Sequence, residues 1–202
     1  GKKSMNVVVN IKKAVENGID VIRIFDALND TNNLKVAMEA AINAGAIASG
    51  CISYTTSPVH THKKYIEIVK ELKEMGAETI CIKDMAGIMG PQEAYDMVSA
   101  IKDAVAMPID LHTHSTTGLA FMTYLKAVEA GCDIIDTAIS PFSGGTSQPA
   151  TETLAYALRQ LGYEVDLDDA CTTKMSDYFK GIRDEFVKDG TLMPKSMATD
   201  TQ

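Results

Sequence analysis

The sequence has 202 residues, of which 46% are hydrophobic, enough to form the core of one globular domain. Its formal net charge of −8 is spread along the chain without a block of Lys or Arg, which argues against nucleic acid as a partner. No apolar run is long enough for a transmembrane helix, and the N-terminus lacks the layout of a signal peptide.

Helical and strand-like patterns alternate along the chain. The first helix is expected at about residues 6–16, before Gly18. Apolar runs typical of strands follow at residues 21–25, 46–52, 79–82, 108–111 and 133–136. Amphipathic stretches typical of helices lie at residues 34–44, 65–75, from 91 onward, 120–130, 151–162 and 168–188. Residues 192–202 are expected to form a tail without compact structure.

This alternation predicts an α/β fold with a parallel sheet covered on both faces. The unit repeats about every 25 to 30 residues, as in a (β/α)₈ TIM barrel. Five predicted strands leave two possibilities, an open doubly wound sheet or a barrel without its first strands. Polar residues end several strands, which favours the barrel, because an open sheet concentrates them at one switch point. We therefore expect residues 1–162 to form a partial barrel and residues 163–202 to begin a C-terminal helical extension.

The four cysteines are spread over the sequence without a Cys-x-x-Cys pair. Cys51, Cys81 and Cys132 fall in apolar strand-like runs, and Cys171 falls in a helical region. This distribution indicates buried reduced thiols rather than a disulfide framework or a zinc knot. It favours a cytoplasmic protein.

Two His-x-His motifs differ in their predicted setting. His112 and His114 end a strand, where residues two apart point the same way, so both imidazoles could bind one metal ion. They could equally be ordinary strand-end histidines. His60 and His62 follow Ser57 and Pro58, a helix-start pattern. Two residues on a helix lie roughly 200° apart, so this second pair should diverge.

Three further positions are candidates for the same pocket. Lys83 ends the preceding strand, although it could simply pair with Asp84. Asp26 also ends a strand and could line the pocket or cap the next helix. Thr146 lies in a glycine-containing polar loop that could be only a helix-capping turn.

Four motifs in order carry a resemblance to a known family. They are the segment at residues 18–29, Lys-Asp-Met-Ala-Gly at 83–87, His-Thr-His at 112–114 and Gly-Thr-Ser-Gln-Pro at 145–149. They resemble the biotin-dependent carboxyltransferases, which include the carboxyltransferase domain of pyruvate carboxylase, the transcarboxylase 5S subunit and the oxaloacetate decarboxylase α subunit. The resemblance implies a barrel that moves a carboxyl group between biotin and pyruvate or oxaloacetate.

The resemblance also implies roles for individual residues. Lys83 would be carbamylated and would bind one divalent metal ion (Zn, Mn or Co) together with His112 and His114. A carbamate is an anionic oxygen ligand, which an ammonium group is not. Thr146 would transfer a proton between pyruvate and biotin. The family's aspartate ligand and its substrate-binding arginine lie on strands before the matched region, so we expect the chain alone to be inactive or nearly so.

The same resemblance implies partners. Biotin would arrive on another domain or chain, because the sequence has no Met-Lys-Met site. The biotinyl carrier domain would act with a biotin carboxylase or with membrane decarboxylase subunits, which would place the protein at the inner face of the membrane. Residues 144–152 favour the decarboxylase α or separate-subunit form over fused pyruvate carboxylase. Exposed barrel edges favour a homo-oligomer.

Two other interpretations stay open. One is a metal-dependent aldol-type lyase or synthase of the isopropylmalate synthase or hydroxymethylglutaryl-CoA lyase type, which shares the His-x-His motif but works without biotin. The other is an inactive structural fragment.

Overall fold

The structure, a computed structural model, describes residues 2–193. Within this range a parallel sheet contains five strands whose spatial order follows the chain, β1-β2-β3-β4-β5. The strands are β1 (Val21–Ile24), β2 (Ile47–Ser53), β3 (Thr79–Asp84), β4 (Ile109–Thr113) and β5 (Ile134–Ile135). The helices are α1 (Lys2–Glu16), α2 (Lys35–Asn43), α3 (His62–Glu74), α4 (Pro91–Val105), α5 (Ala120–Glu129), α6 (Thr151–Gln160) and α7 (Asp169–Lys188), with 3₁₀ turns η1 (Thr31–Asn33) and η2 (Ser140–Phe142).

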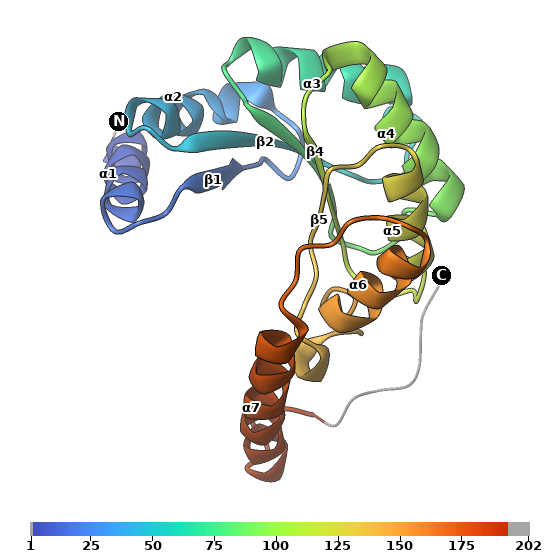
Figure 1. The fold of residues 1–202 in the computed structure, drawn as a ribbon. Coiled ribbons are helices and arrows are strands. Elements are labelled where there is room, and N and C mark those ends of the chain that lie inside the picture. The colour runs from blue at the N-terminus through green and yellow to red at the C-terminus, as the bar shows by residue number, and fades with distance from the viewer. Residues whose placement is uncertain (1, 194–202) are drawn as a thin grey trace.

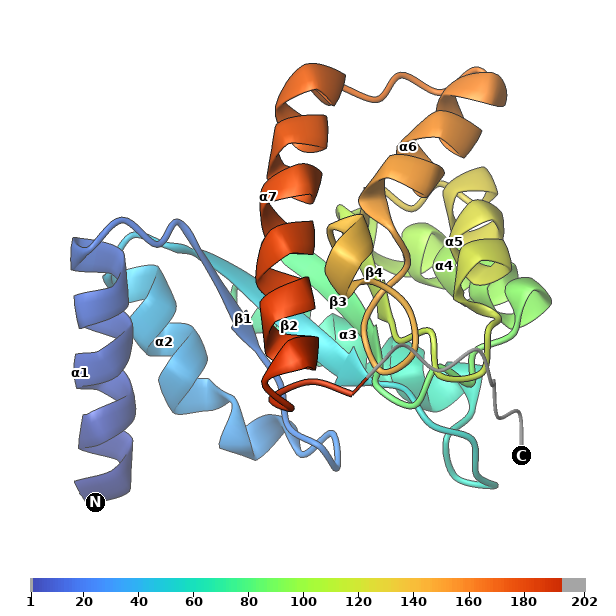
Figure 2. The same ribbon diagram turned by 90° about the horizontal axis from the view of Figure 1, so that it is seen from below.

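The sheet curves into an open arc, with α1 and α6 at its two ends (Figures 1 and 2). Helices α2 to α5 lie on the convex side (Figure 1). Helices on the convex side agree with the predicted partial barrel and not with an open doubly wound sheet, because the inner face of a barrel is filled by side chains of the strands rather than by helices.

Strand alternation divides the two faces of the arc chemically. The convex face of the strands is apolar and packs on the helices as the core, with Ile24, Ala48, Ile52, Ile80, Ile82, Ile109 and Leu111 all buried. The concave face carries small, polar or charged residues instead: Arg23, Ser49, Cys51, Ser53, Cys81, Lys83, Asp110 and His112. The apolar core therefore holds the arc together from outside, and its inner surface is left for polar chemistry.

Every strand and helix expected from the sequence is present, with changes at their ends. The helix expected after Ser57 begins only at His62, and its N-cap is Thr61, whose side chain accepts a hydrogen bond from the Lys64 N–H. Residues 57–60 form a turn of their own, because the His60 N–H bonds to the Ser57 carbonyl at 3.2 Å. Strand β5 is shorter than expected and contains only Ile134 and Ile135.

Helix α7 projects beyond the helices that surround the sheet (Figure 1). It packs on η2, where the rings of Phe142 and Phe179 lie 6.0 Å apart and the hydroxyls of Ser140 and Ser176 are 2.9 Å apart. The unstructured tail expected at residues 192–202 lies mostly outside the described residues.

Two composition-based expectations can be compared with the structure. Cys51, Cys81 and Cys132 are buried free thiols, and Cys171 is a free thiol on the surface. The prediction of buried thiols is confirmed for the first three and was wrong for Cys171. Among the described helices, none combines the length and the apolar character that crossing a bilayer requires.

Candidate active site

Strand register brings the candidate residues to one end of the sheet. Lys83 at the end of β3 pairs laterally with His112 on β4 and with Ser53 on β2. Residues in register on neighbouring parallel strands point to the same face, so Lys83 and His112 both face the inside of the arc. The predicted shared location of these two side chains is supported by this register.

Asp84 organises the turn that follows β3. Its carboxylate is fully buried and accepts hydrogen bonds from the N–H groups of Ile88 at 3.1 Å and Met89 at 2.9 Å. The Thr113 hydroxyl donates a third bond at 2.7 Å. Asp84 is thus committed to the turn and to β4, which leaves the alternative of a Lys83–Asp84 pair without support.

Lys83 has no carboxylate partner within residues 2–193. Its Nζ lies 4.8 Å from the ring centroid of Phe25, in a cation–π arrangement, and the residue is half-buried. In the described residues the Lys83 amine is therefore held by an aromatic ring and not by a carboxylate.

Gly87 explains why the turn passes so close to β4. Its φ is +68°, and a Cβ atom built there would lie 2.4 Å from the His114 carbonyl oxygen. The Thr117 hydroxyl donates to the Gly87 carbonyl, and the His114 N–H donates to the Asp84 carbonyl at 3.2 Å. The turn therefore supports the backbone of the second histidine directly.

His112 and His114 converge, as predicted for a strand end. Their Nε2 atoms lie 3.0 Å apart. The Nδ1 atom of His112 lies 2.6 Å from a carboxylate oxygen of Asp136, and that of His114 lies 2.6 Å from the Thr146 carbonyl oxygen. Both oxygens only accept hydrogen bonds, so both Nδ1 atoms must carry protons.

This assignment leaves both Nε2 lone pairs of the neutral rings facing one point. Two lone pairs 3.0 Å apart repel each other unless a proton or a cation lies between them. Imidazoles that bind metals usually donate their other N–H to a carboxylate or a carbonyl, as His112 and His114 do here. The donor set therefore fits a divalent metal ion. The Gln148 amide, 3.3 Å from His112 Nε2, borders the same point.

A third protein ligand is not assembled around this point. Among residues 2–193, no group of three or more His, Cys, Asp or Glu side chains has an arrangement suited to a metal ion. Lys83 shares the face and the strand end, but within the same residues its ammonium group contacts the Phe25 ring rather than the histidines. The structure thus brings the two histidines together and places Lys83 beside them without joining it to the pair.

Asp136 is held as a carboxylate. Burial opposes ionisation, but hydrogen bonds from His112 and Arg23 lower its pKa to about 2. Asp110 shows the opposite balance. Burial and the neighbouring Asp136 raise its pKa to about 6, although Arg23 opposes this shift. Arg23 forms ion pairs with both carboxylates.

The loop that carries Thr146 is anchored to the end of β4. The Ser115 N–H donates to the Ser147 carbonyl at 2.8 Å, and the Gly144 N–H donates to the Gln148 carbonyl at 2.8 Å. Helix α6 has Ala150 as its N-cap, without a side-chain cap, so the loop is not a helix-capping turn. Its function in the structure is to hold His114 through the Thr146 carbonyl.

Thr146 is exposed, and its hydroxyl has no hydrogen-bond partner within the described part of the chain. A groove of about 400 Å³ lies against this loop, between it and α7. Arg183 and Leu192 line the opposite wall. The hydroxyl is therefore accessible to a second molecule.

Asp26 serves its own loop. One carboxylate oxygen accepts hydrogen bonds from the N–H groups of Leu28 at 2.9 Å and Asp30 at 3.0 Å, and the other accepts one from the Asn33 amide at 3.1 Å. The bond from Asp30 is the main cause that lowers the pKa of Asp26. These contacts commit the Asp26 carboxylate to its own loop. The expectation that it caps the next helix was wrong, because Asp30 is the N-cap of η1 and Leu34 is that of α2.

Sequence reasoning missed Arg23, Asp110 and Gln148 as parts of this site. A signal was present for the first two, because each is a charged residue inside an otherwise apolar strand and their charges are opposite. Nothing in the sequence indicated that they meet, since 87 residues separate them.

Comparison with known protein families gives one clear match. A family model described as HMGL-like matches residues 5–178. A pyruvate carboxylase subunit of Methanocaldococcus jannaschii is 51% identical over 174 residues, which cover 86% of this chain and 31% of that protein. The methylmalonyl-CoA carboxyltransferase 5S subunit of Propionibacterium freudenreichii is 46% identical over 180 residues, 88% of this chain and 36% of that protein. The chain thus spans about a third of the length of these relatives.

Solved structures support the same relationship. The carboxyl transferase domain of Rhizobium etli pyruvate carboxylase with pyruvate superposes with a TM-score of 0.87 at 35% identity, covering 91% of this chain and 32% of that chain. This similarity confirms the predicted α/β barrel-type fold and the resemblance to carboxyltransferases that the four motifs indicated.

Proposed function

The chain belongs to the HMGL-like family, and from this premise we propose that it forms part of a biotin-dependent carboxyltransferase. The reaction would move a carboxyl group between biotin and pyruvate or oxaloacetate. The observation that carries the proposal is the converging pair of Nε2 atoms of His112 and His114, 3.0 Å apart, beside the loop of Thr146. Two relatives, one named as a pyruvate carboxylase subunit and one as a carboxyltransferase 5S subunit, support it.

His112 and His114 would hold a divalent metal ion through Nε2, and Lys83 would join them as its carbamate. A bound Zn, Mn or Co ion would polarise the substrate carbonyl group and favour the enolate. Carbamylation would replace the ammonium of Lys83 with an anionic oxygen donor. It would also end the cation–π contact with Phe25, so the lysine side chain would be free to turn toward the histidines.

Thr146 would move the proton. Its hydroxyl would accept a proton from the methyl group of pyruvate and give its own proton to the ureido nitrogen of biotin, so that the hydroxyl is regenerated. In exchange, the carboxyl group would leave that nitrogen and form a bond to the methyl carbon of pyruvate. Two observations support this role. The hydroxyl is accessible and without a partner in the described residues, and the backbone of the same residue is fixed by His114 at 2.6 Å.

Biotin would come on a carrier domain of another chain or of another part of the same protein. The groove of about 400 Å³ beside Thr146 supports access by such a second reactant. A biotin carboxylase or membrane decarboxylase subunits would complete the enzyme at the cytoplasmic side. Residues 1–162 would belong to the barrel, and residues from 163 onward would begin the helical extension. Assembly as a homo-oligomer is part of this proposal.

A chimera tests the proposal in a complete barrel. This chain would replace the 174 matched residues of the Methanocaldococcus jannaschii protein, with which it is 51% identical. We expect the chimera to retain biotin-dependent carboxyl transfer. The Thr146→Ala chimera should lose at least about 10²-fold in kcat, the usual contribution of one proton-transfer group. A Ser143→Ala chimera in the same loop serves as the control.

The same assay separates the alternatives. A folded chimera that cleaves a hydroxyacyl-CoA without biotin, and does not transfer carboxyl groups, would favour the lyase or synthase class. A folded chimera with neither activity would contradict the proposal and leave the chain as a structural fragment.

A further inference from the structure

Arg23 connects strands that are not neighbours. It lies on β1, and its guanidinium forms ion pairs with Asp110 on β4 and with Asp136 after β5. Strands β1 and β5 are the two edges of the described sheet and share no backbone hydrogen bonds. The side chain therefore reaches across the concave face of the arc, between the two sides seen in Figure 1.

One oxygen of Asp136 serves two partners. Its Oδ2 accepts from His112 Nδ1 at 2.6 Å and also from Arg23 Nη1, while Arg23 Nη2 lies 3.3 Å from Oδ1. Arg23 thus fixes the orientation of the carboxylate that holds His112. The side chains of Asp136 and His112 are 25% and 14% exposed, so solvent screens this chain of contacts only in part.

We propose that Arg23 is a positioning residue for His112 and acts through Asp136. It keeps the proton on Nδ1 and directs the lone pair of Nε2 to the point that it shares with Nε2 of His114. This inference rests on the proposed metal role of His112. It assigns a function to a residue of the first strand that has no direct contact with the histidine.

The guanidinium group suits this position better than an ammonium group. Its planar fork can bind two carboxylates at once, one with each terminal nitrogen, as Arg23 does. Asp110 needs such a partner, because its side chain is only 4% exposed and its Oδ1 has no hydrogen bond within the described residues. Without Arg23, two neighbouring carboxylates would repel each other and Asp136 would lose its fixed orientation.

A purely structural role would predict different behaviour. If Arg23 only braced β1 against β4 and β5, its loss would change stability but would leave the proton of His112 in place. If it positions His112, its loss would change both the proton position and the affinity for metal. The tautomer can be measured without metal and without activity.

The test uses the full chain with Arg23→Met, Arg23→Lys and Lys102→Met. Nitrogen-15 NMR of the imidazoles reports which nitrogen of His112 is protonated, and calorimetry with Co²⁺ reports affinity. Lys102 is the matched control, because it forms an ion pair with Asp133 at the opposite end of β4 and β5. We expect Arg23→Met to give a mixture of His112 tautomers and about 10–100-fold weaker Co²⁺ binding, the usual loss for a group that orients a metal ligand.

Arg23→Lys keeps the charge but not the fork, so we expect an intermediate loss of affinity. Lys102→Met should match the wild type in both measurements. If Arg23→Met does not fold, Arg23→Met combined with Asp110→Asn removes the unpaired buried charge, and the same readouts apply. Should both fail to fold, Arg23→Lys decides.

Wild-type tautomer and wild-type affinity in the folded variants would overturn the inference. A chain that binds no Co²⁺, but whose His112 tautomer changes in Arg23→Met, would uphold the positioning role and contradict the proposed metal function. The two failures are therefore distinguishable.

Discussion

The chain contains two His-x-His motifs, and their side chains are arranged differently. In the first, His60 Nδ1 lies 2.7 Å from the Ser57 hydroxyl, whereas His62 Nε2 lies 2.9 Å from a Glu93 carboxylate oxygen. In the second, His112 and His114 meet at 3.0 Å through Nε2. The spacing is the same, but only the second pair points at one place.

Secondary structure makes this difference. A strand places residues two apart on one side, whereas His60 precedes α3 and His62 is its first residue, so their directions are unrelated. The second pair also has oxygen acceptors on both Nδ1 atoms, supplied by Asp136 and by the Thr146 loop. Only the second pair therefore combines strand geometry with outer partners of the kind that metal-binding imidazoles usually have.

The largest expected difference is in metal binding. We expect His112→Ala combined with His114→Ala to weaken Co²⁺ or Zn²⁺ binding by more than about 100-fold, since loss of outer partners alone gives about 10–100-fold. His60→Ala combined with His62→Ala should leave the affinity unchanged. Metal content per chain after gentle purification, followed by titration after chelation, measures both. Equal loss in the two double variants would refute the contrast.

Substitution of Gly87 tests the turn that packs against the backbone of His114. Gly87→Ala should destabilise the fold by about 2 kcal/mol or more, because φ is +68° and the new Cβ would meet the His114 carbonyl. Gly181 in α7 is the control, because a Cβ atom there meets nothing within 4 Å. Gly181→Ala should stabilise by roughly 0.5–1 kcal/mol. Urea unfolding of both variants gives the two free energies.

Thr61 lies between His60 and His62, and its substitution measures how much this segment stabilises the fold. Thr61→Ala removes the N-cap of α3 and should lower the free energy of unfolding by about 1 kcal/mol. Metal affinity should not change. Thermal unfolding measures the loss of stability, and calorimetry measures the metal affinity. A loss of metal binding in this variant would mean that the two segments are coupled.

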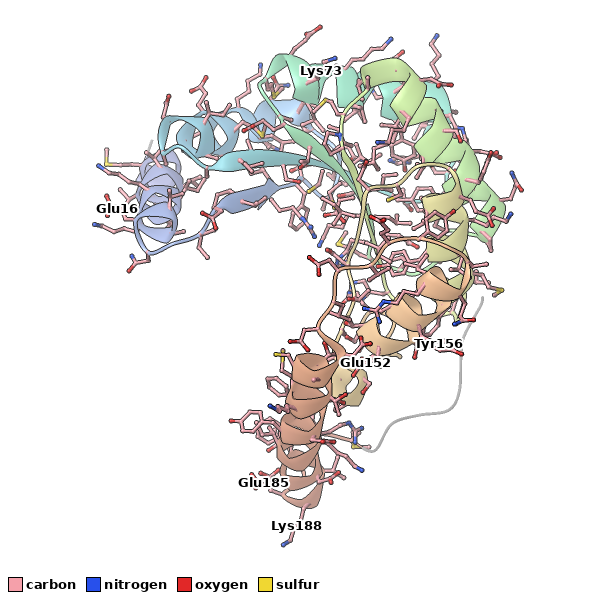
Figure 3. The ribbon with its side chains drawn as sticks, viewed as in Figure 1. Glu16, Lys73, Glu152, Tyr156, Glu185 and Lys188 are labelled. Carbon is pink, nitrogen blue, oxygen red and sulfur yellow. The ribbon has the colours of Figure 1, made fainter. Side chains whose placement is uncertain are left out.

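A fourth prediction concerns Glu152, which accepts a hydrogen bond from Ser140 in the segment before the Thr146 loop. This loop contacts His114 of the second histidine pair. Burial opposes ionisation of this residue, but hydrogen bonds, including one from the Ser140 N–H at 3.1 Å, lower its pKa. Figure 3 shows Glu152 at the start of α6, beside α7. Its contribution should be present above its ordinary pKa of 4.5 and should be lost as the pH falls through the lower folded value.

Because Glu152 is only half-buried, solvent screens its interactions in part, and the loss should be less than about 1 kcal/mol. Unfolding of Glu152→Gln between about pH 3 and pH 7 should show a smaller pH dependence than the wild type. Identical pH profiles would show that the carboxylate does not stabilise the loop.

Local sequence rules predicted most of the fold. Glycines after helices and apolar runs placed α2, α5 and β2 within one or two residues, because caps and periodicity are properties of neighbouring positions. The start of α3 was misplaced, since Ser57 and Thr61 are both possible caps and only the turn between them decides.

The site was predictable only in part. The His112–His114 convergence follows from strand alternation, and the position of Lys83 follows from the repeat. The long-range contacts do not follow from local patterns. Arg23 meets Asp136 from 113 residues away, and Thr146 reaches His114 through its backbone, which no side-chain motif reveals.

The strand order of the sheet has a consequence for its dynamics. Each strand pairs with the next along the chain. The stability of each strand therefore depends mainly on its immediate neighbours, as in repeat proteins. Central strands β2, β3 and β4 are secured on two sides, whereas β5 contributes two residues and pairs with β4 alone. Amide protons of the central strands should therefore exchange with deuterium most slowly, and protection should decrease outward in steps that follow the strand order.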